Sequence, residues 1–393
     1  MSKIKMGFDI GNNRMKIAIS RAGKLEFHDI RLPENMVENG GITMPNTFAE
    51  FLKSTRKTLK LPRGEAALVL PSDQVICRLV TMPWMTEEQL LLNLPYEFYD
   101  FIQGDTDKYF CDYAICDDLP LPEEEEARLL EAAASREDPL EDLFQDPRQG
   151  LTQSVSQAPA QSLRQASTQD LAQASAQDLT QDPSQEVTMM AAAAAKEQLY
   201  QYIHMFSRAG IRLKILLPQE MALIALVKKH SKGLQHWPPD YCFIDLGHVS
   251  TKIIVVYHDR IQATRQIAMG GRNLDAAIAD HLEIDTFLAN SYKINNYQNI
   301  LESPVCQEIF NRIAVEILKV INFYQFTYPD SRLDGVYLAG GGANVKPLRQ
   351  IIRDTVGMEL LPVDELLPKT EEDTFACLSG LFAAGVSMAE KGD

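Results

Sequence analysis

The chain has 393 residues, enough for two ordinary domains or for one domain divided into two lobes. Its 45% apolar content is typical of a soluble globular protein, and its formal charge of −16 argues against nucleic acid or anionic lipid as a direct partner, because both are bound by basic surfaces. The six cysteines include no CxxC pair, which argues against zinc and thioredoxin-like chemistry.

The first part of the chain alternates between strand and helix patterns. Residues 5–32 alternate apolar and polar side chains in three runs, which predicts a three-stranded meander. An amphipathic helix over 47–61 and two strands within 65–83 follow. Thr86 and the glutamates after it predict the start of a helix over 86–102, and 108–116 alternates again as a strand.

The composition changes after Leu119. An acidic run covers 123–126, and five consecutive octads from Gln149 keep Gln at the first and fifth positions and Leu or Val at the seventh. An eight-residue period fits no helical repeat, and one apolar residue in eight cannot offset the entropy of ordering the chain. Residues 119–189 are therefore predicted to be a disordered insertion, either a linker without function or an interaction tail.

Ordered patterns resume at Thr188, which is a candidate cap for a long helix that ends at Gly210. The remaining predicted elements, in chain order, are a strand at 211–218, a helix at 219–230, a second three-stranded meander at 241–271, helical stretches at 272–298 and 304–328, a strand, Gly-rich turn and helix at 333–357, and a final helix at 374–389.

Two segments in opposite halves of the chain share one pattern. "FDIGNNRMKIAI" and "FIDLGHVSTKIIVV" both run from an apolar strand through Asp and Gly into a short polar turn, then Lys and a second apolar strand. The matching residues are Asp9 with Asp245, Gly11 with Gly247 and, approximately, Lys16 with Lys252. Backbone N–H groups of such turns can surround phosphate oxygens, and an Asp at the strand end can hold Mg²⁺ through water. Two facing hairpins could hold the phosphates of a nucleotide, although either one alone could be an ordinary turn.

A third element is "VYLAGGGANVKPL", in which three glycines separate a buried strand from a helix. In this order, DIGNNRMK, QEMALIAL, DLGHVSTK and LAGGGANVKPL resemble the actin-like ATPase superfamily. Within it, "LVTMPWMTEEQLLLNLPYEFYDFI", "KEQLYQYIHMFSRAGIRLKILLPQEMALIAL" and "MGGRNLDAAIADHLEI" are most similar to the PilM family of type IV pilus assembly proteins, with the FtsA family next. The resemblance covers about 2–118 and 190–390.

The resemblance implies an α/β, two-lobed actin-like ATPase fold, each lobe a mixed sheet flanked by helices, with ATP in the cleft between them. The implied divisions are 1–77 with 190–239 for the first lobe, 78–118 for a small inserted subdomain, 119–189 for the disordered insertion, 240–270 with 333–393 for the second lobe core and 271–332 for its helical subdomain.

The resemblance also implies the roles of individual residues. Asp9 and Asp245 would hold Mg²⁺ through water, and Glu220 is a tentative general base that orients the attacking water. Residues implied around the nucleotide are Gly11, Asn12, Asn13, Gly247, His248, Ser250 and Thr251 at the phosphates, Lys16 as a charge beside the β and γ phosphates, and Gly271, Lys293, Gly340, Gly341 and Gly342 near the adenosine. The chain departs from relatives at Asn12 and Asn13, where small hydroxyl residues are usual, and at Asn290, where many carry a ribose-binding glutamate.

The function implied is that of a cytoplasmic, ATP- and Mg²⁺-binding scaffold of the pilus machinery, with at most weak ATPase activity. Its implied partners are the N-terminal tail of the inner-membrane protein PilN, held in a groove beside the small subdomain, and other inner-membrane or motor components, which would keep it peripheral at the membrane. Self-association is left open. The alternatives are an FtsA-like division protein and a small-molecule kinase of the same fold.

Overall fold

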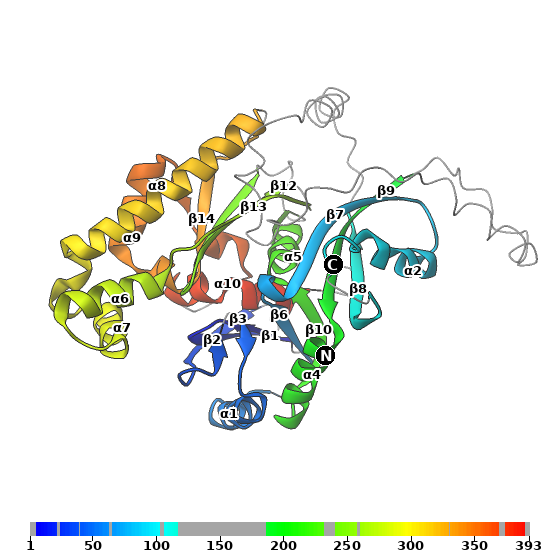
Figure 1. Cartoon of the computed structure of the whole chain (residues 1–393), viewed down its shortest axis with the longest axis horizontal. Helices are drawn as coiled ribbons and strands as arrows, with labels where there is room; N and C mark the ends of the chain where they lie inside the picture. The colour runs from blue at the N-terminus through cyan, green and yellow to red at the C-terminus, as the bar shows by residue number, and fades with distance from the viewer. Residues whose placement is uncertain are drawn as a thin grey trace, which may run out of the picture. The chain divides into compact units, whose positions relative to one another are not determined.

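The computed structural model describes residues 5–21, 24–38, 40–62, 65–102, 106–116, 186–231, 240–257, 260–329, 331–368 and 374–389 (Figure 1). Residues 1–81, 85–116 and 188–393 form one compact unit, which contains both large sheets and the cleft discussed below. Residues 82–84 and 117–187 group separately. The disordered insertion predicted over 119–189 therefore lies outside the described residues, except for its last four positions.

The first lobe is built on a five-stranded mixed sheet in the order β10-β6-β1-β2-β3. Its strands are β1 (Lys5–Ile10), β2 (Arg14–Arg21), β3 (Lys24–Arg31), β6 (Glu65–Leu70) and β10 (Arg212–Pro218). β1, β6 and β10 run parallel, whereas β2 and β3 are added antiparallel, so the predicted N-terminal meander is confirmed.

The second lobe repeats this topology in a sheet of order β13-β12-β11-β14-β15. Its strands are β11 (Tyr241–Leu246), β12 (Thr251–Tyr257), β13 (Arg260–Ile267), β14 (Gly335–Ala339) and β15 (Glu359–Leu361). Again three strands are parallel and a meander supplies the other two. The two-lobed actin-like fold expected from the sequence is thus present, and the repeat seen in the two Asp-Gly segments extends to whole sheets.

Helices pack against these two sheets. α1 (Pro45–Thr58) and α4 (Lys196–Arg208) pack together beside the first sheet (Figure 1). Phe8 of β1 meets Phe206 of α4 edge to face, with ring centroids 5.1 Å apart. α5 (Gln219–Ser231) contacts strands of both sheets, and α10 (Thr374–Met388) packs on α5 and on β1 and β2. Glycine in β1 allows this approach: a Cβ added at Gly7 would lie 1.9 Å from the carbonyl oxygen of Ala383 in α10.

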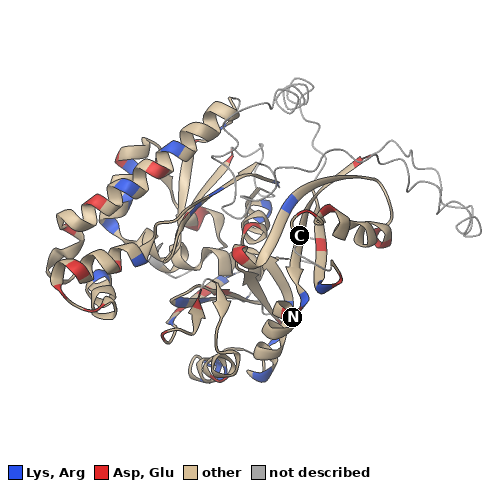
Figure 2. Ribbon diagram, in the orientation of Figure 1, with Lys and Arg blue, Asp and Glu red and all other residues tan. Residues whose placement is uncertain are grey.

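Four further helices complete the second lobe: α6 (Gly271–Leu282), α7 (Thr286–Asn295), α8 (Pro304–Thr327) and α9 (Lys346–Val356). The helical stretch predicted over 272–298 is broken, because Glu283 adopts a left-handed conformation at φ 53° and Asp285 caps a new helix through the N–H of Leu288. Figure 2 shows acidic and basic side chains interspersed along α8 and α9. In the part of the chain that the structure describes, no helix is long and apolar enough to cross a bilayer.

The small sheet has the order β7-β9-β8 and consists of β7 (Val75–Pro83), β8 (Tyr109–Ile115) and β9 (Glu186–Ala195). α2 (Glu87–Glu97) packs on β8 and starts with the expected Thr86 cap, which forms a capping box with Gln89. The remaining short elements are β4 (Val37–Glu38), β5 (Gly41–Ile42) and the 3₁₀ turns η1 (Ser72–Gln74), η2 (Thr106–Lys108), η4 (Tyr297–Glu302), η5 (Gly341–Asn344) and η6 (Val363–Leu366).

The predictions for residues 186–195 are wrong. The sequence predicts that the insertion runs to 189 and that the alanine run after Thr188 begins a long helix, but residues 186–195 form strand β9 and α4 starts only at Lys196. Each alanine from Ala191 to Ala195 pairs across the ladder with a residue of β8, for example Ala193 with Cys111. Alanine has the highest helix propensity, but pairing with a neighbouring strand outweighs a preference worth less than about 1 kcal/mol per residue.

Candidate functional site

The two Asp-Gly segments form matching hairpins. In the first, the N–H of Gly11 donates to the carbonyl of Arg14 at 3.0 Å, and in the second the N–H of Gly247 donates to Ser250 at 3.1 Å. The ladder pairs Asp9 with Lys16 and Asp245 with Lys252. Lys16 and Lys252 are therefore direct counterparts, a closer match than the sequence alone indicates.

A cleft of about 450 Å³ lies between the two hairpins. Residues of the predicted site that line it are Asp9, Gly11, Asn12, Asn13, Lys16, Asp245, Gly247, His248, Ser250, Thr251, Gly271, Lys293, Gly340, Gly341 and Gly342. Segments from distant parts of the chain thus meet at one cavity, as the predicted site requires. Glu220 is the one predicted site residue that does not line it.

The charges at the bottom of the cleft interact across the lobes. Lys16 Nζ lies 3.2 Å from Asp9 Oδ2, and both side chains are largely buried. Burial alone would lower the pKa of Lys16, but the charges of Asp9, Asp245 and Asp29 raise it above its ordinary value. Burial raises the pKa of Asp245, and the charge of Asp9 adds to this effect, while Lys16 acts against it. Asp9, Asp245 and Lys16 are therefore one electrostatic cluster.

This cluster fits a cation that is bound mainly through water. Among the described residues, no group of three His, Cys, Asp or Glu side chains could hold a metal ion directly. Mg²⁺ keeps several water ligands and commonly takes one or two carboxylates together with substrate phosphates. Asp9 and Asp245, one from each hairpin, are a donor set of that kind.

The Gly-rich turn is packed against the second hairpin. Gly340 has φ of +81°, and a Cβ added there would lie 2.4 Å from Asp245 Oδ1 and 2.8 Å from the carbonyl oxygen of Leu246. Only glycine tolerates both this conformation and this approach. Gly341 differs, because a Cβ there would meet nothing within 4 Å although the residue lines the cleft. The absence of a side chain at Gly340 therefore lets the turn pack against Asp245, and Gly341 lines the cavity without filling it.

Another charged cluster lies beside the implied adenosine region, around a buried carboxylate that sequence reasoning missed. Asp275 of α6 is 2.7 Å from Lys293 Nζ, and it accepts from the Asn290 amide at 3.1 Å. Lys293 also donates to the carbonyl of Gly271 at 3.0 Å. His248 Nδ1 is 3.8 Å from Asp275, but burial and Lys293 lower the pKa of His248, so that the imidazole is neutral near pH 7.

Asn290 has an acceptor to offer in this cavity. It lines the cleft, and its Oδ1 is buried without a hydrogen-bond partner among the described residues. The amide nitrogen is directed to Asp275, so the oxygen is the atom left for a ligand donor. Asn290 thus differs from the glutamate of many relatives by contributing no charge.

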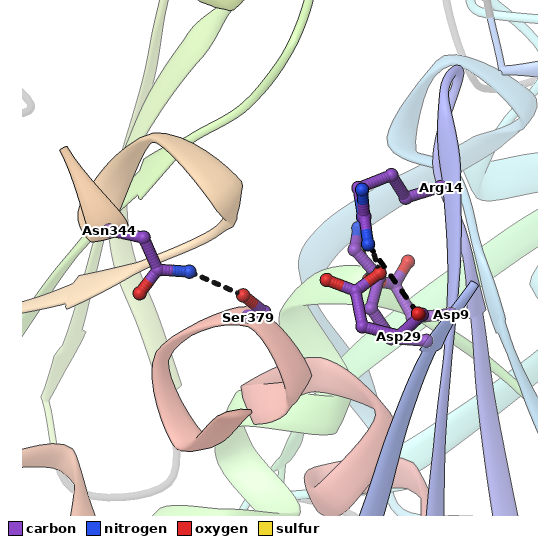
Figure 3. A network of polar contacts seen from close by, with 6 residues as sticks. Asp9, Arg14, Asp29, Asn344 and Ser379 are labelled. Atoms are coloured by element: carbon purple, nitrogen blue, oxygen red, sulfur yellow. Dashed lines mark hydrogen bonds and ion pairs between the residues drawn. The ribbon is translucent and has the colours of Figure 1, made fainter. Parts of the chain in front are cut away.

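Other cleft residues were also missed. Arg14 and Asp29 pair at 2.6 Å near Asp9, and Asn344 donates to Ser379 at 2.8 Å (Figure 3). All of these line the cavity. Arg14 lies within the first motif, at the position of Ser250, so its place at a phosphate-sized turn was accessible from the sequence. Asp29, by contrast, comes from β3 and is brought there only by strand pairing.

Two predicted site residues have side chains that are already engaged. The carboxylate of Glu220 accepts from Ser72 Oγ at 2.8 Å and lies 3.6 Å from Lys252 Nζ. Its neighbour Gln219 faces the cleft and donates to Asp245 Oδ2 at 2.8 Å. The hydroxyl of Thr251 donates to the carbonyl of Met269 at 2.9 Å. The roles predicted for Glu220 and Thr251 remain predictions.

Comparison with known proteins points in the same direction. The family model for type IV pilus assembly protein PilM matches residues 175–367. No curated protein matches the chain. A solved PilM-PilN type IV pilus biogenesis complex is similar to this chain with a TM-score of 0.69 and 17% identity, covering 99% of this chain and 98% of the other. The ethanolamine utilization protein EutJ from Carboxydothermus hydrogenoformans follows with a TM-score of 0.50 and 13% identity, covering 98% and 91%.

Both structural matches are below 25% identity, so they show a similarity of fold alone. The family match adds a relationship in sequence over the segment that contains α4, α5, the second hairpin and the Gly-rich turn. The resemblance to the PilM family of type IV pilus assembly proteins predicted from the sequence is therefore confirmed, in sequence over residues 175–367 and in actin-like fold over the whole chain.

Proposed function

We propose that the chain is an ATP-binding, actin-like scaffold of a type IV pilus assembly machine. The observation that carries this proposal is the pair of hairpins that bring Asp9, Lys16 and Asp245 together at one cleft, closed by the Gly-rich turn. The cavity of about 450 Å³ is within the range of pockets that hold cofactors. The match to the PilM family model supplies the pathway.

In this proposal Asp9 and Asp245 hold Mg²⁺ through water, and the bound cation would supply neutralising charge to the phosphates. The backbone N–H groups of Asn12, Asn13 and His248 face phosphate oxygens. Lys16 adds a positive charge between the two carboxylates. Asn290 Oδ1 offers an acceptor to the nucleoside, and Gly341 gives it space.

Hydrolysis is expected to be weak at most. Glu220, the predicted general base, does not line the cavity and is bonded to Ser72 and paired with Lys252. Gln219 stands at the cavity in its place, and an amide can orient water but cannot accept its proton. The nucleotide would therefore act mainly as a ligand that stabilises one arrangement of the lobes.

The proposed partner is the N-terminal tail of a PilN-like inner-membrane protein, and the similarity to a solved PilM-PilN complex supports a PilN-like partner. An extended tail could lie in a groove between the first lobe and the small subdomain of about 78–118 and bury a few apolar anchors. This contact, together with other inner-membrane or motor components, would hold the chain at the cytoplasmic face of the membrane. Self-association stays open.

Two measurements test this proposal separately. Isothermal titration with ATP should show Mg²⁺-dependent binding to the full chain, and co-purification should depend on an intact PilN-like tail. Binding of ATP without any effect of tail deletion would refute the groove. Turnover stimulated by a sugar or small acid would instead favour a kinase.

A further inference from the structure

Lys252 is a buried lysine that lines the cleft, and its amine is bonded to residues of the other lobe. It belongs to β12 of the second lobe, but its Nζ donates to Ser72 Oγ of the first lobe. The same amine donates to Gln219 Oε1 at 3.0 Å and lies 3.6 Å from Glu220. Two of the three donors of the amine are used by these hydrogen bonds, and Glu220 supplies an opposite charge nearby. The amine of Lys252 therefore joins the lobes at the cleft, whereas its counterpart Lys16 pairs with Asp9.

Gln219 connects this buried group to the proposed magnesium site. Its Oε1 accepts from Lys252 and lies 3.2 Å from Ser72 Oγ, whose one hydroxyl proton is shared between this oxygen and Glu220. Because its oxygen faces these donors, its nitrogen must face the other way, and it donates to Asp245 Oδ2 at 2.8 Å. A cation bound through water at the carboxylate of Asp245 would compete with Gln219 for it. A ligand that displaces Gln219 from Asp245 would therefore also alter the contact between Gln219 and Ser72.

Ser72 opens the 3₁₀ turn η1 (Ser72–Gln74), whose other end contacts the first hairpin. Gln74 Nε2 donates to the carbonyl of Gly40 at 2.6 Å, and the N–H of Gly40 donates to Asn12 Oδ1 at 3.1 Å. The Tyr202 hydroxyl of α4 donates to Gln74 Oε1 at 3.0 Å. η1 is thus hydrogen-bonded to residues that reach both hairpins of the cleft.

η1 continues directly into β7, which belongs to the small sheet. We propose that η1 is a coupling element that transmits occupancy of the cleft to the small subdomain, through Ser72 from the second hairpin and through Gln74 from the first. This inference rests on the proposed function, because it needs a ligand in the cleft. It adds a route by which that ligand alters the surface proposed for the partner, and by linkage the partner would alter ligand affinity equally.

Hydrogen–deuterium exchange of the full chain, with and without ATP and Mg²⁺, tests this route. Peptides covering both hairpins report on the cleft, and peptides covering α2 and β8 report on the small subdomain. The variant is Gln74→Met, which removes both side-chain bonds of a residue that does not line the cleft. The matched control is Gln350→Met, whose amide pairs with Asp354 on the exposed surface of α9.

We expect the ligand to protect the hairpins and to change exchange in α2 and β8 by about twofold or more in the wild type and in Gln350→Met. In Gln74→Met the hairpins should still be protected, with ATP affinity within about threefold of the wild type, while the response of α2 and β8 is lost. Ser72→Ala, which removes the other contact, should lose the same response and serves if Gln74→Met does not fold.

Each of the other outcomes contradicts one particular part of the proposal. Protected hairpins with an unchanged small subdomain in the wild type refute the coupling but leave nucleotide binding intact. A response that persists in both variants refutes the role of η1. Unprotected hairpins in the wild type refute the proposed nucleotide site itself, and the coupling falls with it.

Discussion

Asp9 and Lys16 are cross-strand partners in the first hairpin, with Lys16 Nζ 3.2 Å from Asp9 Oδ2. Asp245 and Lys252 hold the same register in the second hairpin, but Lys252 is bonded to Ser72 and Gln219 instead. One repeated motif therefore serves two purposes. In the first copy the lysine pairs with the aspartate of its own hairpin, and in the second the lysine joins the two lobes, although both lysines line the cleft.

Replacing Lys16 by Met should weaken binding of ATP with Mg²⁺ by about 10- to 100-fold, because one charged hydrogen bond to phosphate is lost. The unliganded protein should also lose about 1–3 kcal/mol, since Asp9 and Asp245 are left facing each other. The raised pKa of Lys16 means that its stabilising charge is fully present at neutral pH and is lost only as the pH rises through that pKa. Titration calorimetry and urea unfolding measure the two effects.

Lys53, a half-buried residue of α1 paired with Glu50 and remote from the cleft lining, is the matched control. Lys53→Met should change neither quantity appreciably. Equal ATP affinity in the Lys16 and Lys53 variants would contradict the place given to Lys16 at the phosphates.

Asp245→Asn should stabilise the unliganded protein while removing its response to Mg²⁺. Burial raises the pKa of Asp245, so the carboxyl binds a proton more tightly in the folded state than in the unfolded state. At neutral pH, where the group is charged, this burial lowers the free energy of unfolding. The asparagine removes that cost, and we expect a gain of about 1–2 kcal/mol at pH 7. The gain should shrink as the pH falls through the raised pKa toward the ordinary one, where the carboxyl is protonated in both states.

Urea unfolding of both proteins between pH 5 and pH 8, with and without Mg²⁺ and ATP, provides the measurement. A variant that is less stable than the wild type at pH 7 would show that Lys16 and Gln219 outweigh the burial of the carboxylate. An undiminished gain from Mg²⁺ would place the cation elsewhere.

Gly340→Ala and Gly341→Ala should separate packing from binding. Alanine at Gly340 meets a left-handed backbone and a carboxylate oxygen at 2.4 Å, so we expect a loss of about 2–5 kcal/mol. Alanine at Gly341 points into open space, so stability should stay within about 0.5 kcal/mol. ATP affinity should nevertheless fall in Gly341→Ala, because the methyl group enters the cleft. Equal stability of the two variants would contradict the geometry of the turn.

The sequence predicted correctly those elements whose contacts are local in the chain. Strand alternation, the Thr86 cap and the two Asp-Gly turns are local, and the structure confirms these elements. Gln219 as a cleft residue and Asp275 as the partner of a cleft lysine were missed because their contacts come from the opposite lobe or from another helix. No spacing in the sequence reports such contacts, which depend on how the sheets are brought together.

The helix predicted for the alanine run at 191–195 is wrong for the opposite reason. Its local signal was strong, but it was outweighed by pairing between β9 and β8, which are far apart in sequence. Small side chains also suit this strand, since Ala191, Ala193 and Ala194 are buried. Residues that read as a helix by propensity can therefore serve as a strand where the neighbouring layers leave little room.

Ala192→Val tests this assignment in solution. Ala192 is half-buried and pairs with Asp112 of β8, so a β-branched residue should favour the strand and leave stability unchanged or raise it by up to about 1 kcal/mol. In a helix the same change would cost about 0.5 kcal/mol. Gln201→Val on the exposed face of α4 supplies that comparison and should be destabilising by about this amount. Urea unfolding measures both variants, and a loss of stability in Ala192→Val equal to that of Gln201→Val would favour the helix first expected from the sequence.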